Sequence, residues 1–313
     1  MSTSVSLTPS AKWLSPKGDA LVIAGPCSVE TPGQVYETVK QLAATGKVDI
    51  IRGGIWKPRT RPGAFEGVGE EGLPLLTESA RAFGLPCMTE VATPAHVEAA
   101  LRHNVDMLWI GARTTVNPFS VQAIADALRG TDVPVWVKNP VNPDIGLWLG
   151  AVERLAGVGL KKIGLIHRGF TPLGDTPLRN LPEWSLALKM REQMPEAPMV
   201  NDPSHIAGRR DLLASITRKA LSLGMDGWMI ESHVAPQEAW SDAKQQIVPS
   251  ALPTLLAEAQ QEKNAQTATG LLPQLEALMQ TLENRLQQIR VLAGAQQEEQ
   301  LLKVLAEEGL SLQ

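Results

Sequence analysis

Cysteine, long apolar runs and net positive charge are all scarce in this sequence. Its 313 residues include two cysteines, Cys27 and Cys87, which cannot form a disulfide framework and are typical of a reducing cytosol. No run approaches the roughly 18 apolar residues of a membrane span, and residues 1–19 lack the apolar core of a signal peptide. A net charge of -4 provides no positive field for nucleic acid or an anionic membrane. We therefore expect a soluble, cytoplasmic protein without a nucleic-acid or membrane partner.

Eight short apolar runs are present, and a stretch with helical periodicity follows each of them. At 43% hydrophobic residues, the chain is able to bury a full core. The apolar runs, which we expect to be strands, are 20–24, 48–51, 86–91, 106–110, 134–138, 162–166, 198–201 and 227–230. The expected helices are 33–44, 72–83, 94–103, 118–128, 144–156, 182–194, 209–223 and 236–257. Several of these helices begin at Thr, Asn or Asp beside a proline and several end at a glycine, which are common start and stop signals.

The alternation of strands and helices predicts the fold class. Near-continuous apolar strands indicate a parallel sheet that is covered by helices. Eight β-α units within residues 20–258 match the number of units and the size of an α/β (β/α)8 TIM barrel. The alternative is a doubly wound open sheet, but no glycine fingerprint follows the first expected strand. We predict the barrel, preceded by an N-terminal extension at residues 1–19.

The composition changes after residue 258. Residues 259–270 are mostly polar, and we interpret them as a linker. Residues 271–313 are predicted to form a helical tail, because apolar side chains recur there at steps of three and four, at Leu275, Leu278, Leu282, Leu286 and Ile289. The apolar face of this tail must be buried against the barrel or another subunit, and we expect a homo-oligomer, either a dimer or a tetramer.

One segment carries a high density of positive charge. Directly after the expected strand 48–51, four cations lie in a short loop that is rich in proline and glycine: Arg52, Lys57, Arg59 and Arg61. A loop of this kind can build an anion site. A solvated basic turn or a nucleic-acid patch has the same composition, so the segment alone leaves all three interpretations open.

Polar or ionisable residues follow every expected strand, at the end where barrel enzymes form their active sites. Five of these residues are cations, namely Arg52, Lys57, Arg113, Lys138 and Arg168. Like charges at one mouth repel each other, so the cluster indicates an anionic ligand that offsets the repulsion. Arginine grips phosphate or carboxylate with two donors and lysine adds a point charge, which suits a substrate with several negative charges.

A second group of strand-end residues offers metal ligands. Cys27, His205 and Glu231 follow the first, seventh and eighth strands, which are neighbours where the barrel closes, and Asp242 lies beyond the eighth. A thiolate, an imidazole and two carboxylates suit a divalent transition metal such as Mn, Fe, Co or Zn. The alternative is a buried free cysteine beside an ordinary hydrogen-bonded pair.

The sequence contains five ordered motifs: Ala24-Gly25-Pro26-Cys27-Ser28, Lys57-Pro58-Arg59-Thr60, Ile110-Gly111-Ala112-Arg113, Asp202-Pro203-Ser204-His205 and Met229-Ile230-Glu231-Ser232. Together they resemble the DAHP synthase family, whose members make 3-deoxy-D-arabino-heptulosonate 7-phosphate. The similarity is to the branch related to KDO-8-phosphate synthases, and it covers about residues 20–250. KDO-8-phosphate synthases share the Gly25-Pro26-Cys27 motif, whereas Lys57-Pro58-Arg59-Thr60 is the DAHP form.

The resemblance implies an activity and a cofactor. A transferase of this family condenses phosphoenolpyruvate with erythrose 4-phosphate and water in an aldol-type reaction and releases phosphate, which is the first step of the shikimate pathway to aromatic amino acids. The resemblance also implies a divalent metal ion whose ligands are Cys27, His205, Glu231 and Asp242. The identity of the metal does not follow from it.

The resemblance further implies roles for the cationic residues. The phosphate of phosphoenolpyruvate would be bound by Arg113, Lys138 and Arg168, and its carboxylate would lie near Arg52 and Lys57. Erythrose 4-phosphate would be received by Pro58, Arg59 and Thr60. Lys57 is the candidate for proton donation, and His233 is a weaker candidate for handling the water.

Three alternatives to this function stay open. The first is the KDO-8-phosphate synthase type of aldol condensation, which uses arabinose 5-phosphate. The second is a bifunctional enzyme, because the tail 271–313 is faintly similar to the opening helix of a chorismate mutase, which we interpret as a truncated or degenerate remnant. The third is a catalytically inactive barrel that binds sugar phosphates.

Overall fold

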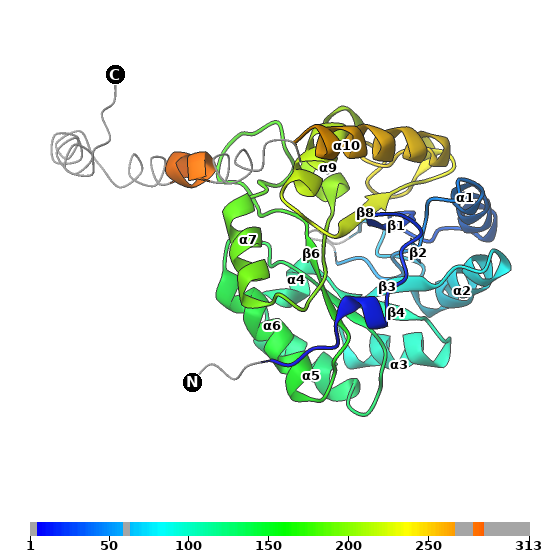
Figure 1. Ribbon diagram of the computed structural model, residues 1–313. Coiled ribbons are helices and arrows are strands. Elements are labelled where there is room, and N and C mark those ends of the chain that lie inside the picture. Colours follow the sequence, from blue (N-terminus) through cyan, green and yellow to red (C-terminus); the bar gives the residue numbers. More distant parts are fainter. Residues whose placement is uncertain (1–4, 59–62, 267–277, 285–313) are drawn as a thin grey trace, which may run out of the picture. The chain divides into compact units, whose positions relative to one another are not determined.

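The computed structural model describes residues 5–58, 63–266 and 278–284 of the chain. The chain divides into two compact units, residues 1–268 and residues 269–313. The larger unit is a closed barrel of parallel strands in the order β1-β2-β3-β4-β5-β6-β7-β8, which confirms the predicted TIM barrel. Figure 1 shows these strands at the centre of the unit, with the helices on the outside.

The eight strands lie where the apolar runs predicted them, within one or two residues. Their bounds are β1 Leu21–Gly25, β2 Ile50–Arg52, β3 Cys87–Val91, β4 Met107–Ile110, β5 Val135–Lys138, β6 Ile163–His167, β7 Met199–Asn201 and β8 Gly227–Glu231. The barrel closes between β1 and β8, which pair from Leu21 with Gly227 to Gly25 with Glu231. Five strands extend to a polar residue that the prediction placed at or just beyond the strand end, namely Arg52, Lys138, His167, Asn201 and Glu231.

Large apolar side chains fill the inside of the barrel. The interior cluster includes Ile50, Trp109, Trp136 and Met229, and all of them are almost fully buried. Trp13, from the N-terminal extension, packs against this cluster with its ring centroid 5.7 Å from that of Trp136. The described part of the extension is therefore part of the barrel's packing.

The helices follow the predicted pattern in seven of the eight units. Their bounds are α1 Pro32–Ala44, α2 Gly72–Ala82, α3 Pro94–Arg102, α5 Pro118–Ala127, α6 Ile145–Gly157, α7 Trp184–Gln193 and α9 Leu213–Ser222. The side chains of Thr31, Thr93, Asn117 and Asp144 each accept a hydrogen bond from the first turn, so the local start signals are used as caps. Two short helices after β4 and β7, α4 Ala112–Thr115 and α8 Pro203–Ala207, were not predicted.

The prediction of one helix over 236–257 is wrong. The 3-10 turn Pro236–Glu238 is followed by an irregular loop, and the helix α10 begins only at Leu252 and runs to Gln266. Asp242 adopts a left-handed φ of 50°, which interrupts any helix. The loop backbone bonds to β8 instead, because Ile247 N–H donates to the Glu231 carbonyl and His233 N–H donates to the Ile247 carbonyl.

The helix α10 runs to Gln266 and so extends into residues 259–270, whose role as a linker stays a prediction. In the smaller unit, residues 278–284 are helical, in agreement with the periodic pattern. The rest of the tail, including Leu275, Leu286 and Ile289, lies outside the described residues. Within the described ranges, no helix combines the length and the apolar content that crossing a bilayer requires.

Candidate active site

A period of two in the strands explains why polar residues meet at one end of the barrel. Alternate side chains of a strand point to the same side. In six of the strands, or directly after them, a polar residue lies two positions beyond an apolar residue of the interior cluster. These polar residues are Arg52, Glu90, Lys138, Arg168, Asp202 and Glu231. These side chains continue the interior rows past the apolar core. The carboxyl end of the barrel is therefore charged where its centre is apolar.

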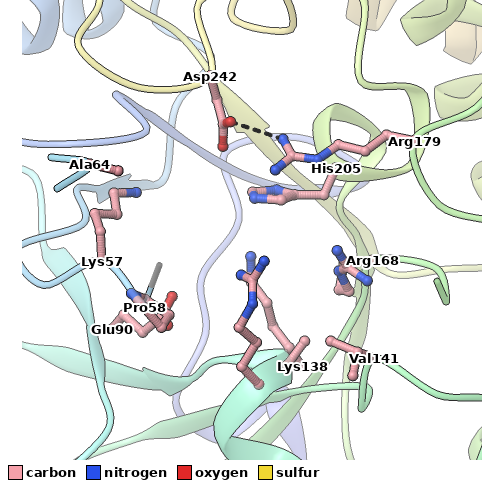
Figure 2. A pocket seen from close by; sticks show the side chains of 12 residues that line it. Lys57, Pro58, Ala64, Glu90, Lys138, Val141, Arg168, Arg179, His205 and Asp242 are labelled. Atoms are coloured by element: carbon pink, nitrogen blue, oxygen red, sulfur yellow. Dashed lines mark ion pairs between the residues drawn. The ribbon is translucent and has the colours of Figure 1, made fainter. Parts of the chain in front are cut away.

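A cavity of about 230 Å³ lies at this end. Seven of the predicted site residues line it, namely Lys57, Pro58, Arg113, Lys138, Arg168, His205 and Asp242. Glu90 and Arg179 also line it, and Figure 2 shows Arg179 in an ion pair with Asp242. Cys27, Arg52 and Glu231 do not line the cavity and are almost completely buried beside it.

Three of the four predicted metal ligands form one group. One ligand atom each from Cys27, Glu231 and Asp242 lies within 4.8 Å of the other two. His205 borders the group, with its Nε2 3.8 Å from Glu231 Oε1. Cys27 and His205 follow β1 and β7, Glu231 ends β8 and Asp242 lies beyond it. These three strands are adjacent because the barrel closes between β8 and β1.

The contacts of Glu231 test whether this group fits a metal ion. Glu231 is fully buried, yet its Oε1 accepts no hydrogen bond from any described residue, although Arg52 Nη2 lies 3.3 Å away. Buried carboxylate oxygens normally have a partner. A free oxygen beside a thiol and an imidazole is a suitable ligand for a first-row transition metal. The donor set and the geometry therefore fit a divalent ion.

The pKa values around the group keep the imidazole and the carboxylates ready to bind a cation. Burial lowers the pKa of His205, so its ring is neutral. Burial opposes ionisation of Asp242, but the positive charge of Arg179 holds its pKa below the ordinary value. Burial raises the pKa of the Cys27 thiol to about 12, and the charge of Glu231 adds to this effect. Cys27 is therefore protonated until a cation replaces its proton.

Asp202 sets the orientation of His205. Its Oδ2 lies 2.8 Å from His205 Nδ1 and 2.8 Å from Lys138 Nζ. Burial opposes its ionisation, but His205 and Lys138 hold its pKa well below the ordinary value. An ionised Asp202 requires a proton on Nδ1, so Nε2 is left free to act as a ligand. Asp202 belongs to a quoted motif, but no local pattern predicted this role.

Lys57 reaches the metal-ligand group from the opposite wall. Its Nζ donates to the Cys27 carbonyl oxygen and lies 3.0 Å from Cys27 Sγ. A Cβ at Gly54 would lie 2.7 Å from this Nζ, so the absence of a side chain at residue 54 leaves room for the ammonium group. Lys57 is thus both at the cavity and against the thiol.

Positive charge dominates the rest of the cavity wall. Burial lowers the pKa of Arg168 to about 10, and repulsion from Arg179 and Arg113 contributes, while Asp202 opposes the effect. Arg52 lies behind the wall, with its guanidinium carbon 5.0 Å from the centre of the Trp109 ring. Among the described residues, its Nε and Nη1 have no hydrogen-bond partner. An anionic ligand would relieve both the repulsion and the unsatisfied donors.

Besides Cys27, Arg52 and Glu231, three more predicted site residues are not among those that line the described cavity. Arg59 and Thr60 lie outside the described residues, as does Arg61. His233 is buried and does not line the cavity; its Nε2 lies 3.4 Å from Glu30 Oε2, and its Nδ1 accepts from the Ala235 backbone N–H. The structure therefore gives His233 a partner away from the cavity.

Arg179 is a cavity residue that the sequence did not reveal. It lies in the connection between β6 and α7, and its Nη1 is 3.0 Å from Asp242 Oδ1. No periodic pattern marks it. A signal was nevertheless present, because this connection is long and follows a strand at its carboxyl end, where barrel loops carry function.

Comparison with known proteins places the chain in a family. The model of the DAHP synthetase I family matches residues 5–268. The chain belongs to this family. Its membership confirms the resemblance of the five motifs, and members of the DAHP synthase family generally depend on a metal, which agrees with the group formed by Cys27, Glu231 and Asp242.

The named relatives of this family member include a heptonate aldolase and an octonate aldolase. A phospho-2-dehydro-3-deoxyheptonate aldolase of Thermotoga maritima is 35% identical over 226 residues, which are 72% of this chain and 64% of the relative. A 2-dehydro-3-deoxyphosphooctonate aldolase of Rhodopseudomonas palustris is 27% identical over 257 residues, covering 74% of this chain and 84% of the relative. The chain thus matches slightly less than two thirds of the length of the Thermotoga protein.

A solved structure supports the same fold. The crystal structure of DAHP synthase from Thermotoga maritima matches with a TM-score of 0.72 and 30% identity, and the match covers 83% of this chain and 74% of that chain. The agreement includes most of the barrel unit of this DAHP synthetase I family member.

Proposed function

We propose that the protein is a metal-dependent DAHP synthase, which condenses phosphoenolpyruvate with erythrose 4-phosphate and water and releases phosphate. The observation that carries the proposal is the cation-lined cavity directly beside the Cys27, Glu231 and Asp242 group. The first feature suits two phosphorylated substrates, and the second suits activation of an aldehyde. The proposed product is 3-deoxy-D-arabino-heptulosonate 7-phosphate.

Phosphoenolpyruvate is the substrate that the cationic wall suits best. We assign its phosphate to Arg113, Lys138 and Arg168, which line the cavity together. We assign its carboxylate to Lys57 and Arg52. The unpartnered Nε and Nη1 of Arg52 support this assignment, since no other described residue satisfies them. Buried donors of this kind cost free energy until an acceptor reaches them.

Erythrose 4-phosphate is assigned to the loop that begins at Lys57. Pro58 lines the cavity. The assignment of Arg59 and Thr60 rests on the motif alone, since both residues lie outside the described ones. The Lys57-Pro58-Arg59-Thr60 motif and the higher identity to the heptonate relative, 35% against 27%, favour the four-carbon aldehyde over arabinose 5-phosphate.

The residues that would hold the metal are Cys27, His205, Glu231 and Asp242, and Mn, Fe, Co and Zn all suit this mixed set of ligands. A divalent ion bound there supplies Lewis acidity toward the aldehyde carbonyl. Asp202 keeps the His205 ring oriented, and Arg179 holds one oxygen of Asp242. The protein's own contribution at this point is thus a fixed set of ligands in a buried pocket.

Lys57 is the proposed proton donor. Attack by C3 of phosphoenolpyruvate on the aldehyde carbon turns the carbonyl oxygen into an alkoxide, which needs a proton. The Lys57 ammonium, 3.0 Å from Cys27 Sγ, is at the edge of the proposed metal site and carries such a proton. General acid catalysis of this kind typically contributes roughly 10²–10⁴-fold. His233 bonds to Glu30, and no contact supports its assignment to water handling.

The test measures phosphate release from phosphoenolpyruvate after chelator treatment and after addition of single divalent metals. Release that depends on both erythrose 4-phosphate and metal supports the proposal, whereas full activity of the chelated protein contradicts the metal site. Stronger activity with arabinose 5-phosphate would assign the KDO-8-phosphate type instead. If no phosphate is released with either aldehyde, the result would favour the catalytically inactive barrel. Lys57→Met should lose at least about 10²-fold in kcat, while Lys47→Met at an exposed site should not.

Other expectations stay predictions. A chorismate mutase activity of the tail would appear as conversion of chorismate to prephenate, and light scattering during size-exclusion chromatography would determine whether the protein is a dimer or a tetramer. The cytoplasmic location also stays a prediction.

A further inference from the structure

Two adjacent glutamines lie in the loop between β8 and α10. Gln245 and Gln246 are almost completely buried, with exposures of 1% and 0%. Neither lines the cavity, and neither has a role in the reaction proposed above. A buried amide needs partners at both its oxygen and its nitrogen, so the partners of these two side chains carry information.

Gln245 contacts the metal-ligand group at both ends of its amide. Its Nε2 donates to Glu231 Oε2 at 2.6 Å. Its Oε1 accepts from Arg179 Nη1 at 2.7 Å. The same Arg179 Nη1 lies 3.0 Å from Asp242 Oδ1. One amide therefore connects two carboxylates of the proposed metal site, one directly and the other through Arg179.

These contacts determine which oxygen of each carboxylate faces the other metal ligands. With Glu231 Oε2 held by Gln245, the remaining oxygen is Oε1, which has no hydrogen-bond partner among the described residues. With Asp242 Oδ1 held by Arg179, the remaining oxygen is Oδ2, which lies 3.4 Å from Cys27 Sγ. Asp242 Oδ2 thus faces the Cys27 thiol, which donates to it, and Glu231 Oε1 lies 3.8 Å from His205 Nε2 and 3.3 Å from Arg52 Nη2.

Gln246 holds the backbone of the same group. Its Oε1 accepts from the Cys27 backbone N–H at 2.9 Å, and its Nε2 donates to the Ser241 carbonyl oxygen at 2.8 Å. Ser241 directly precedes Asp242, whose φ of 50° is unfavourable for a residue with a side chain. The backbone of this loop bonds to β8 at Ile247, beyond Asp242, and the side chain of Gln246 holds the loop at the residue next to Asp242.

We propose that Gln245 is a positioning residue of the metal site, which orients Glu231 directly and Asp242 through Arg179. Gln246 supports it by tying Cys27 to the loop of Asp242. The inference rests on the metal site of the proposed function. Only an amide of this length provides a donor for Glu231 and an acceptor for Arg179 at the same time. Partners of this kind typically change metal affinity by about 10–100-fold when they are removed.

Cobalt(II) binding tests the proposal without relying on turnover. The metal-free protein is titrated with Co²⁺ in competition with a chelator, and the thiolate charge-transfer band and the intensity of the visible d–d bands are recorded. Gln245→Met removes both hydrogen bonds at nearly constant volume, and Gln245→Asn keeps an amide that is too short to reach both partners. Thr217→Val is the matched control, because it removes a buried hydrogen bond to the Leu213 carbonyl within α9.

The experiment distinguishes an error in the proposed metal site from an error in the proposed role of Gln245. If wild-type protein gives no thiolate band with Co²⁺, the proposed metal site is wrong. If wild type binds Co²⁺ and both Gln245 variants bind it with the same affinity and spectrum, only the role of Gln245 is wrong. We expect both variants to bind about 10–100-fold more weakly and with altered d–d intensity. Thr217→Val should lower the unfolding temperature but leave affinity and spectrum unchanged. If Gln245→Met does not fold, the Asn variant decides.

Discussion

Metal binding should release one proton, and that proton should come from Cys27. In the metal-free protein, burial raises the pKa of this thiol to about 12. Burial lowers the pKa of His205, whose ring is therefore already neutral near pH 7. Despite their burial, Glu231 and Asp242 have pKa values below the ordinary ones, because cationic neighbours favour their ionised forms. Only one of the four proposed ligands thus carries a proton that a metal must displace.

The size of the expected pH effect on metal affinity follows from the difference between the pKa of Cys27 and neutral pH. With a pKa of about 12, roughly one thiol in 10⁵ is ionised at pH 7. Because the thiolate is the form that binds, the apparent metal affinity should rise about tenfold per pH unit, or about 1.4 kcal/mol. From about pH 6 to about pH 8 the gain is about 100-fold. The affinity therefore increases with pH, because protons compete with the metal for the Cys27 sulfur at every pH below the raised pKa of this thiol.

Calorimetry in buffers with different ionisation enthalpies measures this proton directly. The slope of the apparent binding enthalpy against the buffer enthalpy should correspond to about one proton released per metal ion. Cys27→Ala is the control, and it should bind more weakly and release almost no proton. Wild-type protein that binds metal with no proton release and with constant affinity across this pH range would refute the reasoning.

Two further substitutions test a residue that supports the metal site and a residue at the closure of the barrel. Asp202→Asn should lower metal affinity about 10–100-fold, because the Nδ1 of His205 loses its carboxylate partner. It should also lower the free energy of unfolding by about 3 kcal/mol, since Lys138 is left buried without a counter-charge, as chemical denaturation would measure. An unchanged midpoint and affinity would contradict this role. Gly227→Ala should cost about 1–3 kcal/mol, because a Cβ there would overlap the Leu21 carbonyl where β8 joins β1. The same measurement on Gly150→Ala, where a Cβ meets nothing, should show no such loss.

The positions of the strands and of most helices were predictable because their signals are local. A short apolar run bounded by turn residues specifies a buried strand, and a capping side chain such as Thr93 or Asn117 marks the first turn of a helix. The region 236–257 was mispredicted for the opposite reason. Its backbone bonds to β8 and its Asp242 is left-handed, and neither feature is visible in the local pattern.

In the site, too, features that depend on neighbouring residues were predictable from the sequence, whereas contacts between distant residues were not. The sequence alone indicated which residues lie at the mouth, because each directly follows a strand and all strands of a parallel barrel end on one side. Their partners were not predictable, since Gln245 meets Arg179, 66 residues away in the sequence, and His233 meets Glu30, 203 residues away. Pairing over such separations depends on how the barrel closes.

By itself the sequence determined the barrel, its family and the residue types at its mouth, because strand periodicity, caps and motifs are properties of neighbouring residues. Only the tertiary structure decided that Cys27, Glu231 and Asp242 meet, that Arg179 joins them and that His233 does not line the cavity. The reason is geometric. Closure between β1 and β8 brings the two ends of the barrel together, and the orientation of each carboxylate depends on donors from distant loops.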